Sequence, residues 1–356
     1  MVIKMNKRVE LPIVDALYST YQYQGPSTAI AVNNPTLRNW YLNERMNLAC
    51  NRKFLNGYTT PHIVVPATNW KHCPYIEQIE ISSQFVGGYI NHIIRKMLDE
   101  GYYVIYGNID DYYVEGKSWY KERHFRHDGM ICGYDQEDKT YCLYAYDSNW
   151  IYHKFWTSQR SINKGRIAVE KQGLFSKFTA VKVTEDQIEF SPQIVYDNLM
   201  EYLDSDLHKY PEDGEGNVKG IIVHEYIAKY LGKLFDGSIP YERMDRRIFR
   251  LIWEHKKVML ERIEKIEQSL DMGNEISEMY RPLVAEADLM RMLYASHHMK
   301  RRDSALPIIQ KKLRKLMQEE RKILERLLTE MDRRFKNETV EIHKTGNAET
   351  SLAGDR

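Results

Sequence analysis

Cysteine is scarce in this sequence. Four cysteines occur among 356 residues, at positions 50, 73, 132 and 142. Their wide spacing excludes the dense disulfide framework of small secreted domains and favours folding in a reducing compartment, so we expect a cytoplasmic protein. Cys132 and Cys142 flank one predicted turn, and we interpret them as buried free thiols rather than as a disulfide.

Long apolar runs and an excess of one charge are also missing. No stretch of about 18 apolar residues occurs, so no transmembrane helix is predicted. The first 20 residues include Glu10 and Asp15 and lack an apolar core, which argues against a secretory signal. Lys plus Arg number 51 and Asp plus Glu 50. This balance gives no global attraction to nucleic acid or to an anionic membrane, and we expect neither as a partner.

The spacing that marks metal sites is missing as well. His224 and Glu225 begin like a zinc-protease motif, but Ala228 stands where the second histidine belongs. The adjacent pairs at 72–73 and 297–298 have no second pair at ligand spacing. We therefore expect neither a metal nor a diffusible cofactor.

A chain of this length is sufficient for two domains. Residues 1–205 contain short β-prone runs and few helices, which predicts an α+β domain with an antiparallel sheet and packed helices. Residues 206–216 are polar and predict a linker. Residues 217–334 show helical periodicity throughout, which predicts an all-α helical bundle. The polar residues 335–356 lack periodicity and predict a disordered tail.

The clearest helix of the first domain is predicted over residues 82–100, where apolar residues recur at intervals of three and four. Ser82 offers an N-cap oxygen, and Gly101 follows as the C-terminal stop. Gly87 and Gly88 fall inside this predicted helix, and we interpret them as a point of close packing.

The chain is organised around residues 102–147. Two Tyr-rich runs in this stretch are joined by a polar turn at 136–139, which predicts an antiparallel hairpin. His127 begins one strand and Asp147 ends its neighbour, so we expect the two to lie side by side. A carboxylate orients an imidazole and stabilises its protonated form, which suggests His127 as general base and Asp147 as its orienter. The alternative is a polar residue that caps a strand end, and His124 is interpreted as a surface histidine.

This pattern resembles the papain-like cysteine-peptidase superfamily. More narrowly, it resembles the butirosin-biosynthesis protein H N-terminal domain family (C39-like) and its relatives in bacterial peptide-antibiotic clusters. The likeness rests on His127, the Gly133–Asp135 corner, Asp147 and the segment 110–113. It implies a papain-like fold and an accessory acyltransferase or amide-forming enzyme of nonribosomal-peptide or related antibiotic biosynthesis. Its thioester substrate arrives on the phosphopantetheine arm of an acyl or peptidyl carrier protein, and a small amine or peptide accepts the acyl group.

The nucleophile stays open at this stage. The family places its cysteine near the N-terminus, but this sequence has no cysteine before Cys50. Arg52 and Lys53 follow Cys50 and favour a lowered thiol pKa, so Cys50 is the first candidate and Ser27 the second. A chain with no nucleophile is the third possibility, and it predicts a catalytically inactive, peptidase-like binding module for a peptide or carrier protein. The basic residues between 300 and 315 form either a solvated face or a surface that docks an acidic carrier protein.

Overall fold

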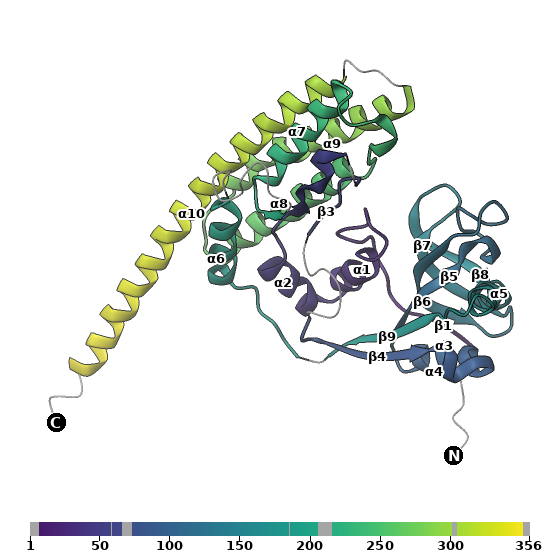
Figure 1. The fold of residues 1–356 in the computed structure, drawn as a ribbon. Helices are drawn as coiled ribbons and strands as arrows, with labels where there is room; N and C mark the ends of the chain where they lie inside the picture. Colours follow the sequence, from purple (N-terminus) through teal and green to yellow (C-terminus); the bar gives the residue numbers. More distant parts are fainter. Residues whose placement is uncertain are drawn as a thin grey trace. The chain divides into compact units, whose positions relative to one another are not determined.

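The computed structural model describes residues 7–57, 59–65, 73–184, 186–205, 216–300 and 305–351, with the side chains of residue 300 and of 338–351 left out. The chain divides into two compact units (Figure 1). The first comprises Met1–Tyr41 and Ala67–Glu189, and the second comprises Leu42–Pro66 and Phe190–Arg356. The predicted linker lies outside the described residues, apart from Gly216.

The first unit contains an antiparallel sheet of seven strands, and the mixed α+β prediction is confirmed. The strands are β1 (Arg8–Glu10), β4 (Ile76–Ser82), β5 (Tyr103–Asp110), β6 (Arg126–Asp135), β7 (Thr140–Tyr146), β8 (Tyr152–Ser158) and β9 (Lys177–Val183). Their order is β4-β9-β5-β6-β7-β8, and β1 pairs with the end of β6. The β6–β7 pair is the hairpin that the sequence predicts.

Helices cover both faces of this sheet. On one face, α1 (Gly25–Asn33) and the first part of α2 (Pro35–Glu44) pack on an apolar cluster that includes Met130 and Tyr144. On the other face, α4 (Ile90–Asp99) and α5 (Gln159–Glu170) pack on a cluster that includes Ile131 and Leu143. Because neighbouring strand residues point to opposite faces, one strand pair supplies both cores.

The helix predicted over residues 82–100 is interrupted. The structure has α3 (Ser83–Val86), η3 (Gly87–Tyr89) and then α4. Gly87 has φ of 44°, which a helix does not allow, and an added Cβ at Gly87 or Gly88 would meet nothing within 4 Å. The pair is therefore a break in the helix and not a point of close packing. The N-cap is confirmed, since the Ser82 hydroxyl accepts a hydrogen bond from the Gln84 amide at 3.3 Å.

Helix α1 begins with Gly25 and Pro26. The chain enters α1 at Gly25, with Pro26 in the first turn, where its missing N–H costs nothing. A side chain at position 25 would clash with the ring of Tyr152, so glycine allows this close approach.

The second unit contains five of the helices, which are α6 (Pro192–Leu203), α7 (Val223–Phe235), α8 (Ile248–Ser269), α9 (Glu275–Lys300) and α10 (Ala305–Ser351). Helix α8 packs on α9, and α10 packs on both α7 and α9. Helix α10 runs on to Ser351, past residue 334, where the sequence predicts the bundle to end. Among the described residues, no helix has the length and apolar composition needed to cross a bilayer.

The second unit also contains a small sheet, so it is not all-α. Strand β2 (Ala49–Asn51) pairs with β3 (Ile63–Val64) and with β10 (Asn217–Lys219). This pairing makes segment 42–66 part of the second unit, although the sequence predicts it in the first domain. The 3₁₀ helix η1 (Arg52–Asn56) follows β2, and its Phe54 packs edge-on against Tyr230 at 5.6 Å.

Candidate functional site

Two consecutive aspartates at the end of β5 each hold one histidine. Both carboxylates are buried, with Asp110 and Asp111 at 2% and 1% exposure. Oδ2 of Asp110 lies 2.7 Å from Nδ1 of His124, and Oδ2 of Asp111 lies 3.2 Å from Nδ1 of His127. The pairing of β5 with β6, which sets Ile109 opposite His127, brings these groups together. Each ring therefore has a fixed orientation.

A buried lysine shares the carboxylate of Asp111. Nζ of Lys117 lies 3.5 Å from Oδ2 of Asp111 and donates to the carbonyl oxygen of Asp128 at 3.4 Å. Burial lowers the pKa of Lys117, and the charge of Asp111 opposes that shift. His127 keeps 27% of its side chain exposed, and its Nε2 has no partner among the described residues. The arrangement presents an oriented imidazole to solvent above a buried ion pair.

The structure does not bring His127 and Asp147 together within the described part of the chain. The pairing of β6 with β7 ends at Met130 and Tyr144, short of both residues. Asp147 instead forms an isolated β-bridge with Lys117. Lys117 therefore lies beside Asp147, where the hairpin prediction places His127.

Asp147 organises the turn that leads into β8. Oδ1 of Asp147 accepts hydrogen bonds from the amides of Asn149 and Ile151, and Oδ2 lies 3.1 Å from Nε2 of His153. Burial acts to raise the pKa of Asp147, but the Ile151 amide, His153 and the Asn149 amide outweigh it and lower the pKa. Asp147 thus orients His153 and a turn, and the orienter of His127 is Asp111.

Cys50 does not have the environment of a nucleophile. It lies in β2 of the second unit and is 3% exposed. Burial raises the pKa of its thiol to about 12, and the charge of Arg52 offsets this only in part. A catalytic thiolate needs a lowered pKa, so the expectation from Arg52 and Lys53 is wrong.

The other candidate nucleophiles are buried too. Cys73, Cys132 and Cys142 are buried and form no disulfide, and the sulfurs of Cys132 and Cys142 lie 3.6 Å apart, as expected from their places around the hairpin turn. Ser27 is fully buried in α1, and its hydroxyl has no hydrogen-bond partner among the described residues. No sulfur or serine oxygen from this set is hydrogen-bonded to His127.

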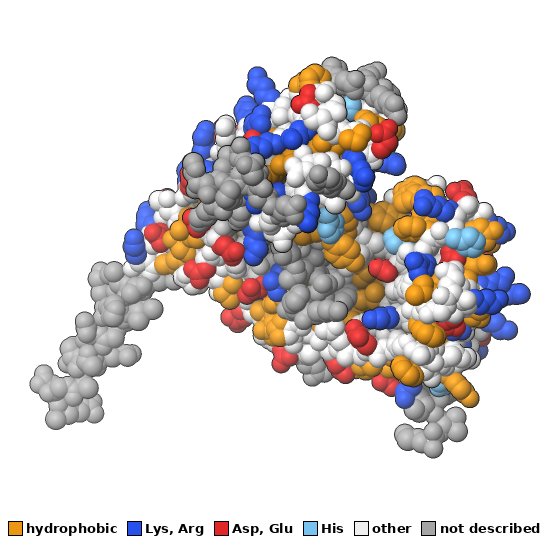
Figure 2. Space-filling model, viewed as in Figure 1, with side chains coloured by type: hydrophobic (Ala, Val, Ile, Leu, Met, Phe, Trp, Pro, Cys, Tyr) orange, Lys and Arg blue, Asp and Glu red, His pale blue; other side chains and the backbone are white. Residues whose placement is uncertain are grey.

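Aromatic side chains surround His127 at the surface. The ring of Phe125 lies edge-on to His127 at 5.1 Å, Trp119 lies 6.0 Å from Phe125, and Trp150 lies 5.4 Å from Trp119. The guanidinium of Arg123 sits 5.5 Å above the ring of Trp119. Phe125 and Trp150 are 37% and 54% exposed. We refer to these five residues as the aromatic surface; Figure 2 shows hydrophobic, basic and histidine side chains intermixed over the first unit.

Sequence reasoning found His127 but missed its partners. The segment 110–113 carries part of the family likeness, and its two adjacent carboxylates, followed by His124 and His127, are also a signal for paired contacts. Nothing local marks Lys117 as buried, because its partners, Asp111 and Asp128, reach it through the fold.

The predicted basic stretch is partly neutralised. Residues 301–304 lie outside the described part of the chain, as does His72. Within it, Lys312 pairs with Glu286 at 2.7 Å and Arg314 with Glu225 at 2.8 Å. A search of the same residues finds no group of three His, Cys, Asp or Glu side chains arranged to hold a metal ion.

Comparison of the chain with models of known protein families and with curated proteins finds no match. The likeness to the butirosin family therefore rests on the sequence motifs alone. The geometry around His127 carries the functional argument.

Proposed function

We propose that the first unit is a binding domain that holds a peptide segment on the aromatic surface. The observation that carries this proposal is the gathering of Trp119, Phe125 and Trp150 around an oriented imidazole. Exposed apolar side chains that collect in one place mark interaction sites, and Trp, Tyr and Arg dominate the binding energy of protein interfaces. On this proposal, the likeness of the sequence motifs to cysteine peptidases does not extend to a catalytic thiolate.

The polar groups of the aromatic surface favour a peptide with acidic and apolar side chains. Nε2 of His127 is available to a backbone amide or carbonyl group, since Asp111 holds only Nδ1. Arg123 lies over the rings of Trp119 and Phe125 and pairs with no carboxylate in the described chain. Its guanidinium is therefore free to bind a carboxylate of the partner. An acidic segment of a carrier protein is one source of such a peptide.

Peptide display tests this proposal. Peptides selected against the full chain are titrated into wild type and variants, and the dissociation constant is measured by calorimetry. We expect Trp119→Ala and Trp150→Ala to weaken binding by about tenfold or more, because each removes a large ring from the contact. Trp156→Ala is the matched control, since Trp156 is 37% exposed on β8 beneath Arg8. Selected peptides that bind Trp119→Ala and Trp150→Ala as tightly as wild type contradict the proposal.

A second candidate function, acyl transfer without a cysteine, is favoured by the 3.2 Å contact between His127 and Asp111. In this reaction the amine nitrogen attacks the thioester carbon and the C–S bond breaks, while His127 takes the proton from the amine nitrogen and gives it to the leaving thiolate. With an N-acetylcysteamine thioester and an amine, His127→Ala is expected to lower amide formation by about 10² to 10⁴ and His124→Ala to lower it less. Equal rates with and without the protein exclude this function for these probes.

A further inference from the structure

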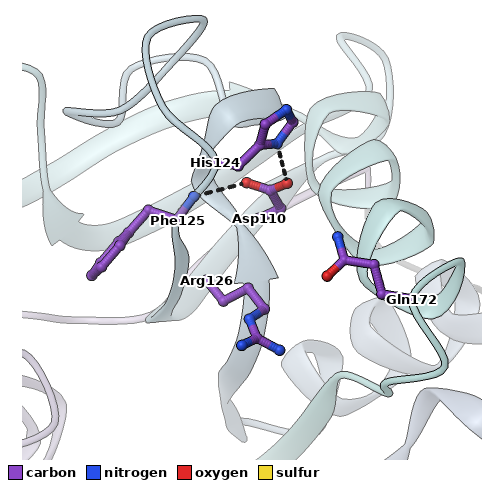
Figure 3. Close-up of a pocket in the computed structure, with 5 residues that line it drawn as sticks. All are labelled: Asp110, His124, Phe125, Arg126 and Gln172. Carbon is purple, nitrogen blue, oxygen red and sulfur yellow. Dashed lines mark hydrogen bonds and ion pairs between the residues drawn. The ribbon is translucent and has the colours of Figure 1, made fainter.

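A pocket of about 310 Å³ opens at the start of β6, next to the pair formed by Asp110 and His124. Its lining comes from three places in the first unit: the end of β5, the chain that enters β6, and the turn after α5. Figure 3 shows His124, Arg126 and Gln172 placed on different sides of Asp110. The volume lies at the lower end of the range for small-molecule sites.

Hydrogen bonds hold one wall of this pocket in place. Oδ1 of Asp110 accepts from the amides of Tyr112 and Phe125, each at 3.2 Å, and Oδ2 accepts from Nδ1 of His124 at 2.7 Å. The ring of Tyr112 stacks on His124, with centroids 4.3 Å apart and planes 25° apart. The imidazole is thus fixed by a bond and by a stacked ring, which leaves its Nε2 edge for a ligand.

The remaining polar groups of the pocket are not used by the protein. Within the described residues, the guanidinium of Arg126 has neither a hydrogen bond nor an ion pair, and the side-chain amide of Gln172 has no hydrogen bond. An arginine presents two parallel N–H groups that match the two oxygens of a carboxylate. Gln172 and His124 add a second and a third group that can donate a hydrogen bond.

We propose that this pocket binds the carboxylate group of a small organic acid or acylated amino acid. Arg126 pairs with the two carboxylate oxygens, and Gln172 and His124 bind the polar atoms next to that group. A single negative charge fits better than a phosphate dianion, because Asp110 already places one carboxylate in the lining. Phe125 supplies an apolar edge for the rest of the ligand. The site shares Phe125 with the aromatic surface, but Arg126 and Gln172 are not part of that surface, so variants at these two positions distinguish the sites.

Calorimetry of the full chain with two matched probes tests this assignment. Hippurate carries a carboxylate, and hippuramide replaces it with an uncharged amide of nearly the same shape. We expect hippurate to bind with a dissociation constant below about 10 mM and at least about tenfold more tightly than hippuramide. Inorganic phosphate is expected to compete more weakly than hippurate.

Variants locate the binding. Arg126→Gln is expected to abolish the preference for hippurate, and Gln172→Ala to weaken it. Two controls are expected to keep the preference for hippurate unchanged. Arg160→Gln makes the same change at an exposed position of α5 outside the pocket, and Trp150→Ala changes the aromatic surface. Circular dichroism checks that each variant is folded. The proposal is overturned by equal binding of the two probes, by no saturable binding of hippurate, by full affinity in folded Arg126→Gln, or by tighter binding of phosphate.

Discussion

Both units contain a buried carboxylate that contacts a lysine and a histidine, but only in the first unit is that histidine partly exposed to solvent. In the second unit, Glu320 of α10 accepts hydrogen bonds from Lys256 at 2.7 and 2.6 Å, from Tyr280 at 2.5 Å and from Tyr202 at 3.2 Å. All four side chains are buried. In the first unit, Asp111 meets a buried Lys117 and a partly exposed His127.

The difference lies in hydrogen-bonding capacity and not in residue type. Donors from α6, α8 and α9 occupy both oxygens of Glu320, so this cluster joins four helices and has nothing left for a ligand. Around the aspartates of the first unit, Nε2 of His127 and the guanidinium of Arg126 remain available within the described chain. We assign function to the polar groups that have no hydrogen-bond partner within the described chain, and we expect the fully bonded groups to contribute to stability.

The largest effect is expected for Glu320→Gln. The change leaves the ammonium of Lys256 buried without a counter-charge, which costs about 3–5 kcal/mol of the free energy of unfolding. Urea denaturation followed by circular dichroism measures it. The double variant Lys256→Met with Glu320→Gln is expected to recover much of the loss, because the Lys256–Glu320 pair then carries no charge. A loss below about 1 kcal/mol in the single variant shows that Glu320 does not hold the helices together.

Acid is expected to destabilise the second unit through two buried histidines. Burial, followed by the charge of Lys256, lowers the pKa of His224 to about 3 and also lowers that of His255. An unfolded histidine titrates near pH 6.5, so below that pH the unfolded chain binds more protons than the folded one. The free energy of unfolding therefore falls as the pH drops below about 6.5, by up to about 1.4 kcal/mol per pH unit for each ring.

Urea denaturation at a series of pH values from about 7 to 4 checks this slope. His224→Asn removes one of the two rings and is expected to reduce the slope. A free energy of unfolding that stays constant between about pH 6.5 and 4.5 in wild type shows that these rings do not stay neutral in the folded chain.

A smaller loss of stability is expected to distinguish Asp111, which the structure places beside His127, from Asp147, which the sequence predicts there. Asp111→Asn removes the carboxylate beside the buried Lys117 and is expected to cost about 2–3 kcal/mol of the free energy of unfolding. Asp147→Asn keeps the bonds to two backbone amides and loses only an ion pair with the exposed His153, so we expect less than about 1 kcal/mol. Thermal unfolding compares them, and equal losses contradict the assignment of Asp111.

Local patterns in the sequence predict much of the fold. The β6–β7 hairpin and the N-cap at Ser82 both follow from residues close in sequence. The break at Gly87 was missed because the apolar period continues through it. The spacing of apolar residues indicates which face is buried, whereas the break comes from the positive φ angle of Gly87.

Contacts between distant residues account for most of the rest. Strand β2 joins the second unit by pairing with β10, more than 150 positions later in the sequence. Asp111 meets His127 because β5 has an irregularity between Tyr106 and Ile109 that shifts its register with β6. The hairpin pattern alone does not reveal this shift in register, and so the sequence prediction gives His127 the partner that simple hairpin pairing suggests.

The central claim is that function in this chain belongs to the exposed groups around His127 and not to a cysteine. Iodoacetamide labelling of the folded full chain near neutral pH, quantified for each cysteine by mass spectrometry, tests this claim most directly. We predict that all four cysteines react at less than about a hundredth of the rate of a free thiol, and equally slowly in His127→Ala, because all four are buried away from the reagent. For Cys50, the first candidate nucleophile, burial also raises the thiol pKa to about 12. One cysteine that labels rapidly in wild type and slowly in His127→Ala would contradict the account and restore the thioester mechanism.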